Sequence, residues 1–108
     1  MRRAAKIDAN QKEVVDALRL AGASVQSLAA VGKGVPDLLV GFKNVTVLME
    51  VKDGKKCLSD RRLTEDQQKW HQQWKGGTVS IVDSVDAALR VLKVVEWTKS
   101  LQKEDDGL

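Results

Sequence analysis

The sequence holds very little cysteine, and this excludes two kinds of structural cross-link. Cys57 is the single cysteine among 108 residues, so the chain forms no intramolecular disulfide and no zinc site built from cysteines. A free thiol is typical of a reducing compartment, and we expect a cytoplasmic protein. Cys57 itself lies in a polar stretch, and we assign it no function.

Long hydrophobic runs are also missing. No apolar run approaches the roughly 18 residues that a membrane span requires. The basic residues 1–6 resemble the start of a signal peptide, but Ile7-Asp8-Ala9-Asn10 follows in place of an apolar region. No repeat, linker or low-complexity block divides the chain. We therefore predict one domain over residues 1–108, with flexible ends at 1–7 and 98–108.

The net positive charge of the chain is small. The chain carries a formal charge of +3, with 31% charged and 43% hydrophobic residues, a composition typical of a soluble globular domain. Such a balance argues against tight unaided binding to DNA. Several basic residues nevertheless lie in turns or clusters, where they either face phosphates or are simply solvated. These residues are Lys33, Lys55, Lys56, Arg61 and Arg62.

The hydrophobic patterns predict an α/β domain with the element order α-β-β-β-α-β-α. The first predicted helix lies between Asp8, which would cap it, and Gly22, and strands follow at 24–30, 34–41 and 45–52. The second half of the chain is predicted to form a helix from Thr64 to Gly76, a strand at 78–82 and a helix that begins after Asp83 or Ser84. A strand, a helix and a second strand in succession imply a right-handed crossover and a parallel pair. We expect a mixed four-stranded sheet, an antiparallel meander plus one parallel strand, with helices on both faces.

The two central strands bring acidic side chains together. If Lys43-Asn44 is a two-residue hairpin loop, Phe42 faces Val45, and Asp37 lies opposite Glu50 at about 4.5–5.5 Å. Two carboxylates at that distance repel each other unless a divalent cation binds between them. Side chains alternate along a strand, so Glu50 and Lys52 share one face of the sheet. Buried carboxylates are costly unless they are paired or bound to metal.

The predicted second helix carries one polar residue with two possible roles. Thr64 and Gln67 have the spacing of a capping box, but Gln67 also shares a helix face with Trp70 and Trp74. If that face packs on the sheet, Gln67 points toward the carboxylates. We expect the two tryptophans to be core or interface residues rather than platforms for bases. His71, the only histidine, lies off this face, and we expect it to be exposed.

These motifs resemble a known nuclease signature. Pro36-Asp37 followed by Glu50-Val51-Lys52 is similar to the PD-(D/E)xK pattern. The wider string resembles the VRR-NUC (virus-type replication-repair nuclease) branch through Gly34-Val35-Pro36-Asp37-Leu38, Glu50-Val51-Lys52, Leu63-Thr64-Glu65-Asp66-Gln67 and Trp74-Lys75-Gly76-Gly77. The resemblance covers about residues 10–92 and implies a restriction-endonuclease-like core.

The resemblance also implies a site. Asp37 and Glu50 would hold Mg²⁺ or Mn²⁺, with the Val51 carbonyl completing the shell, and Lys52 would orient or deprotonate a water or stabilise charge. An acid from the first helix supports the metal in related nucleases, and Glu13 matches that place, although a solvent-facing Glu is the other reading. Gln67 matches a glutamine in the family's site.

We therefore expect a metal-dependent DNA endonuclease that hydrolyses phosphodiester bonds. The resemblance further implies a homodimer acting on branched or Holliday-junction DNA in recombination and repair, in the cytoplasm of a bacterial or phage-infected cell. The alternative is a nucleic-acid-binding module of the same fold that does not cut. A third interpretation makes Asp37 a turn residue and Glu50–Lys52 a surface ion pair. Burial of these side chains would exclude it.

Overall fold

The computed structural model describes residues 8–106, so the basic arm predicted for residues 1–7 lies outside the described residues. The elements are α1 (Gln11–Leu20), β1 (Ser24–Ser27), β2 (Leu38–Phe42), β3 (Val45–Val51), the 3-10 turn η1 (Leu58–Arg61), α2 (Glu65–Gln73), β4 (Val79–Val82) and α3 (Val85–Asp106). Apart from η1, this is the predicted order of elements.

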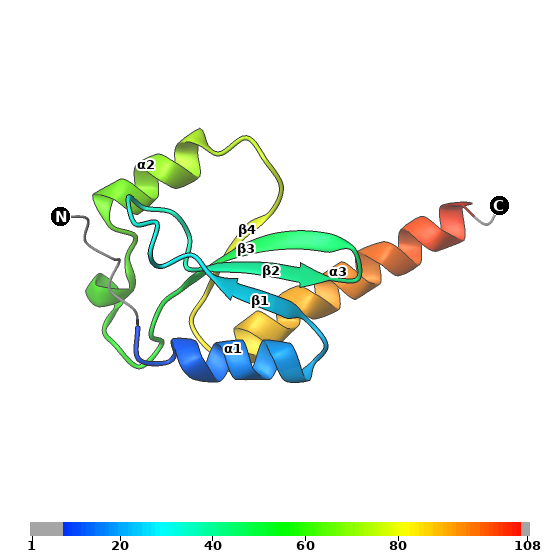
Figure 1. The fold of residues 1–108 in the computed structure, drawn as a ribbon, viewed down its shortest axis with the longest axis horizontal. Helices are drawn as coiled ribbons and strands as arrows, with labels where there is room; N and C mark the ends of the chain where they lie inside the picture. The colour runs from blue at the N-terminus through cyan, green and yellow to red at the C-terminus, as the bar shows by residue number, and fades with distance from the viewer. Residues whose placement is uncertain (1–7, 107–108) are drawn as a thin grey trace.

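One mixed sheet forms the centre of the molecule (Figure 1). The strands lie in the order β1-β2-β3-β4, with antiparallel pairing from β1 to β3 and a parallel β3–β4 pair. The predicted meander plus one parallel strand is confirmed. The crossover through α2 is needed because parallel neighbours cannot be joined by a short hairpin.

The β2–β3 hairpin has the predicted two-residue loop. Lys43 and Asn44 have positive φ angles of 49° and 64°, which is the backbone of a type I′ turn. This loop pairs Phe42 with Val45, and the ladder runs on to Leu38 opposite Met49. The next position along the two strands places Asp37 level with Glu50.

The core lies on one face of the sheet, where α1 and α3 pack side by side (Figure 1). It is built from buried apolar side chains of both helices and of β2, β3 and β4, namely Val14, Leu18, Leu38, Val40, Val47, Met49, Val51, Val82, Ala88, Leu92 and Val95. Because side chains alternate along β3, residues 50 and 52 point to the opposite face. There α2 covers one end of the sheet, near the end of β3 (Figure 1).

Two details at helix ends bear on the sequence predictions. Asp8 does not cap α1: Asn10 occupies that position, without a side-chain cap bond, so Asp8 lies one turn ahead of the helix. The described part of the end predicted from residue 98 is helical, because α3 continues to Asp106. Its predicted flexibility stays a prediction.

Among residues 8–106, no helix is both long and apolar enough to cross a bilayer.

The hairpin loop generates a testable prediction. Asn44→Ala should lower the free energy of unfolding by about 1 kcal/mol, because a Cβ-bearing residue without a locally bonding side chain is disfavoured at positive φ. Asn44→Gly should be neutral or slightly stabilising. Urea unfolding followed by circular dichroism measures both. Equal destabilisation by Ala and Gly would contradict the type I′ geometry.

Candidate functional site

Two carboxylates meet where β2 and β3 leave the core. Asp37 is 6% exposed and Glu50 is 1% exposed. Asp37 Oδ2 accepts a hydrogen bond of 2.7 Å from the backbone N–H of Val51, which fixes the aspartate beside the end of β3. The predicted juxtaposition of Asp37 and Glu50 is thus present, and both groups are buried rather than part of a surface turn or a surface ion pair.

Burial makes the negative charge of Glu50 costly. The pKa of Glu50 is raised from 4.5 to about 9, first by loss of hydration and then by its hydrogen bond with and repulsion from Asp37. Lys52 opposes the shift, and Asp8 adds to it. The positive charge of Lys52 is therefore too small an influence to offset burial and the repulsion from Asp37.

Lys52 and Gln67 join the strand to the helix. Lys52 is 7% exposed, and its Nζ donates a 2.8 Å hydrogen bond to Gln67 Oε1. The same oxygen accepts from the backbone N–H of Thr64 at 2.8 Å, while Thr64 Oγ1 accepts from the N–H of Gln67 at 3.2 Å. Gln67 closes the capping box of α2, as predicted, and it also accepts a hydrogen bond from Lys52. Its part in a nuclease site stays a prediction.

A glycine allows α2 to approach the site. Gly34 has φ +82°, and a Cβ on it would overlap the backbone carbonyl of Asp66 in the first turn of α2. Only a residue without a side chain fits this close backbone contact at that φ. Gly34 thereby lets the segment before Pro36 lie directly against the helix that carries Gln67.

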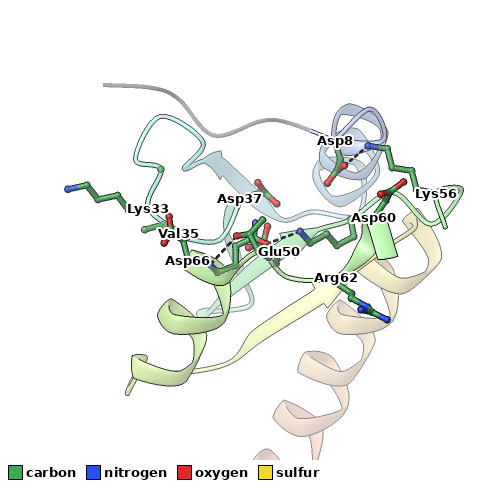
Figure 2. A pocket seen from close by; sticks show the side chains of 14 residues that line it. Asp8, Lys33, Val35, Asp37, Glu50, Lys56, Asp60, Arg62 and Asp66 are labelled. Atoms are coloured by element: carbon green, nitrogen blue, oxygen red, sulfur yellow. Dashed lines mark hydrogen bonds and ion pairs between the residues drawn. The ribbon is translucent and has the colours of Figure 1, made fainter. Parts of the chain in front are cut away.

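These residues surround a cavity of about 520 Å³. Its lining combines the four predicted residues Asp37, Glu50, Lys52 and Gln67 with Asp8, Gly32, Lys33, Gly34, Val35, Lys56, Asp60, Arg62, Thr64 and Asp66. Figure 2 shows Asp37 and Glu50 inside this cavity, with Asp8 and Lys56 on one side and Val35 and Asp66 on the other.

Asp8, and not Glu13, is the acidic residue that the segment at α1 brings to the cavity. Glu13 is exposed and lines separate surface hollows together with Asp53 and Lys55, so its predicted place at the metal site is wrong. Asp8 lines the cavity instead and pairs with Lys56 at 3.3 Å. The sequence analysis treated Asp8 as the cap of the first helix and therefore did not predict it as a residue of the site.

The five predicted basic residues divide into two groups. Lys33, Lys56 and Arg62 line the cavity, and Lys33 extends outward at its rim (Figure 2). Lys55 and Arg61 lie away from it: Lys55 borders the hollow beside Glu13, and Arg61 pairs with Asp83 at 3.5 Å.

His71 is placed differently from its prediction. It is half-buried, and its Nε2 lies 3.8 Å from Glu50 Oε1. Burial, followed by the charge of Lys52, lowers the pKa of His71, so the imidazole is neutral at neutral pH. The prediction of an exposed His71 failed because it took only the helix face of Gln67 and Trp70 as facing the sheet. The residues of α2 that approach the sheet also include His71.

The two tryptophans of α2 lie outside the buried core. Trp70 and Trp74 stack with ring centroids 4.8 Å apart, and Trp74 is 42% exposed. Trp74 Nε1 donates to the carbonyl of Gly77 at 2.9 Å. The stack therefore stiffens the end of α2 rather than filling the core.

The oxygen atoms of the two buried carboxylates are candidate ligands for a divalent cation. Within the described residues no group of three or more His, Cys, Asp and Glu side chains is arranged to hold a metal. The Asp37–Glu50 pair nevertheless offers hard oxygen ligands, and Glu50 Oε1 is buried without a hydrogen-bond partner among residues 8–106. Mg²⁺ commonly uses only one or two carboxylates and keeps several waters, so the pair fits such an ion. The Val51 carbonyl stays a predicted ligand.

Comparison with known proteins bears on the fold. No family model and no curated protein matches the sequence. A solved structure described as "VRR_NUC domain" is similar to the chain, with a TM-score of 0.60 and 26% sequence identity over 77% of this chain and 89% of that one. The predicted resemblance is confirmed, and the α/β architecture is consistent with a restriction-endonuclease-like nuclease domain.

The raised pKa of Glu50 predicts how stability depends on pH without metal. Between its ordinary pKa of 4.5 and about 9, the folded protein keeps a proton that the unfolded chain loses, so the free energy of unfolding should fall as pH rises through this window. Urea unfolding in EDTA at several pH values measures this. Glu50→Gln should flatten the dependence and exceed wild type in stability at the alkaline end.

Glu13→Gln serves as the matched control, because Glu13 is exposed and should leave the pH dependence as in wild type. A Glu50→Gln protein with an unchanged pH profile would show that the buried carboxyl does not govern it.

Proposed function

We propose that this chain, which has the fold of a VRR-NUC domain, is a divalent-metal-dependent nuclease that hydrolyses phosphodiester bonds in DNA. The observation that carries the proposal is the buried Asp37–Glu50 pair, with Lys52 on the same sheet face, at a cavity with basic residues at its rim. Paired buried carboxylates are unfavourable by themselves, and a cation resolves that repulsion.

Asp37 and Glu50 would hold Mg²⁺ or Mn²⁺, and Asp8 is a further carboxylate of the cavity lining whose charge acts on Glu50. A cation bound there lowers the pKa of water and polarises a phosphoryl oxygen. The chain itself fixes the ligands: the Val51 N–H holds Asp37, and the sheet keeps Glu50 away from solvent. We retain Val51 as a ligand through its carbonyl.

Lys52 is the proposed catalytic cation. An ammonium group has three N–H donors, and Gln67 takes one of them at 2.8 Å. The remaining donors are available to a water or to a phosphate oxygen in the cavity. There the positive charge would stabilise the charge that develops as the phosphodiester bond breaks. Gln67 keeps Lys52 aimed at this position.

The shape of the basic surface favours recognition of the DNA backbone over reading of bases. Lys33, Lys56 and Arg62 at the cavity would contact phosphates, while the formal charge is only +3. The low charge implies weak unaided binding of duplex, and we propose that the substrate is branched DNA such as a Holliday junction, in recombination and repair. We place this activity in the cytoplasm, in keeping with the lone Cys57.

A homodimer is part of the proposal. The end of α3 exposes an apolar stripe of Val94, Trp97 and Leu101, which are 55%, 63% and 42% exposed. These residues lie three and four positions apart, so they form one helix face. Two copies of the chain that pair through this face would bury the stripe. The resulting dimer would carry two cavities, which suits the cutting of two strands at a junction.

Cleavage assays test the chemistry. Purified protein with Mn²⁺ should cut a labelled four-way junction in preference to a matched linear duplex, and EDTA should stop it. Asp37→Ala, Glu50→Ala and Lys52→Ala should each lower the cleavage rate by at least about 100-fold, since each removes transition-state stabilisation. Folding is checked by circular dichroism.

Two surface variants match these as controls. Glu13→Ala and Lys55→Ala remove one charge of each sign away from the cavity and should keep near wild-type rates. Metal-dependent cutting of duplex and junction alike would remove the structure preference but keep the chemistry. Binding without cutting of any substrate, unchanged in Glu50→Ala, would instead favour a non-cleaving binding module.

The dimer is tested by molar mass in solution. Wild type should elute as a dimer in size-exclusion chromatography with light scattering, and Trp97→Glu should be a monomer because it puts a charge in the buried stripe. Leu20→Glu is the control, since Leu20 is 91% exposed at the end of α1. A monomeric wild type, or a dimer that Trp97→Glu leaves intact, would refute this surface.

A further inference from the structure

Two buried polar atoms face each other behind the carboxylate pair. Glu50 Oε1 and His71 Nε2 are 3.8 Å apart, and within residues 8–106 neither atom has a hydrogen-bond partner. Buried polar atoms in native proteins are nearly always paired, so a facing pair without partners calls for an explanation. A shift of about 1 Å in either side chain would bring the two atoms to hydrogen-bond distance.

His71 approaches Glu50 from outside the cavity. The cavity lining includes Glu50, Asp37 and Lys52 but not His71, so the imidazole lies behind the carboxylate. Asp37, which hydrogen-bonds with Glu50, lies on the cavity side. The carboxylate of Glu50 therefore lies between its neighbours in the cavity and His71 on α2.

The backbone around His71 is held at both ends of α2. At the start, the capping box of Thr64 and Gln67 fixes the first turn. At the end, Trp70 stacks on Trp74, and its ring also meets that of His71 edge-on at 5.9 Å. A side chain on such a short, fixed helix has little freedom, which suits it to orient another group.

We propose that His71 is a positioning residue for Glu50: its Nε2–H donates to Oε1 of the carboxylate and leaves the other oxygen to face the cavity. Carboxylates that bind metals are themselves commonly hydrogen-bonded by groups that fix their orientation. Either charge state of the imidazole can carry a proton on Nε2, so this role does not depend on titration of His71. The inference rests on the proposed function only in assigning the cation to Glu50.

Metal binding in the absence of DNA tests the role directly. Calorimetric titration with Mn²⁺ compares wild type with His71→Leu, which fills the space without a donor, and His71→Gln, whose amide N–H can reach the same oxygen. His71→Leu should weaken Mn²⁺ binding by about 10-fold or more. His71→Gln should stay close to wild type, and this rescue by a donor is what a purely structural role would not produce.

Further variants guard against trivial effects. His71→Asn keeps a polar group but is too short to reach Glu50, so it should bind Mn²⁺ as weakly as His71→Leu. Gln72→Leu, at the next and exposed position of α2, should bind like wild type. Urea unfolding of each variant in EDTA confirms that all are folded. In cleavage assays, excess Mn²⁺ should largely restore the rate of His71→Leu, because the catalytic groups are intact.

The outcomes separate this inference from the function on which it rests. Wild-type Mn²⁺ affinity in His71→Leu, or equal losses in the Gln and Leu variants, would overturn the positioning role while the nuclease proposal stands. Mn²⁺ binding that follows the expected order, with no cleavage of any DNA, would support His71 and count against the nuclease. Absence of Mn²⁺ binding in wild type would overturn both.

Discussion

The structure depends on one unfavourable contact, the approach of the Asp37 and Glu50 carboxylates at the end of the β2–β3 hairpin. The type I′ loop at Lys43-Asn44 sets the register that brings them level, and the apolar core on the far face of β3 keeps that register from slipping. Repulsion and burial together hold the pKa of Glu50 near 9. The fold thus holds two acidic groups close together, and their repulsion is relieved only when a proton or a cation is bound.

Helix α2 contributes Asp66 and Gln67 to the cavity lining and adds no buried side chain to the core. It stays in place through specific polar contacts: the backbone meeting at Gly34, the bond from Lys52 to Gln67 and the approach of His71 to Glu50. This division of labour is physically reasonable. The sheet and two helices supply stability, and α2 supplies polar groups that its own contacts hold at the site.

The sequence predicted the sheet order, the hairpin loop and the central Asp37, Glu50, Lys52 and Gln67 set, because alternation and turn chemistry are local signals that determine register. It failed where position depends on distant packing. Glu13 matched a helix stripe, yet the path of the chain before α1 brings Asp8 to the cavity instead. His71 was assigned to solvent because helix periodicity alone does not show how wide an arc of α2 the sheet covers.

The shared oxygen of Gln67 has a consequence for motion. It accepts from the backbone of Thr64 and from Lys52 at the same 2.8 Å, so fraying of the first turn of α2 and release of the lysine are one event. Local opening of a helix end costs far less than global unfolding. Amide hydrogen exchange at the start of α2 would therefore report the fraction of molecules whose lysine is out of place, long before the sheet itself opens.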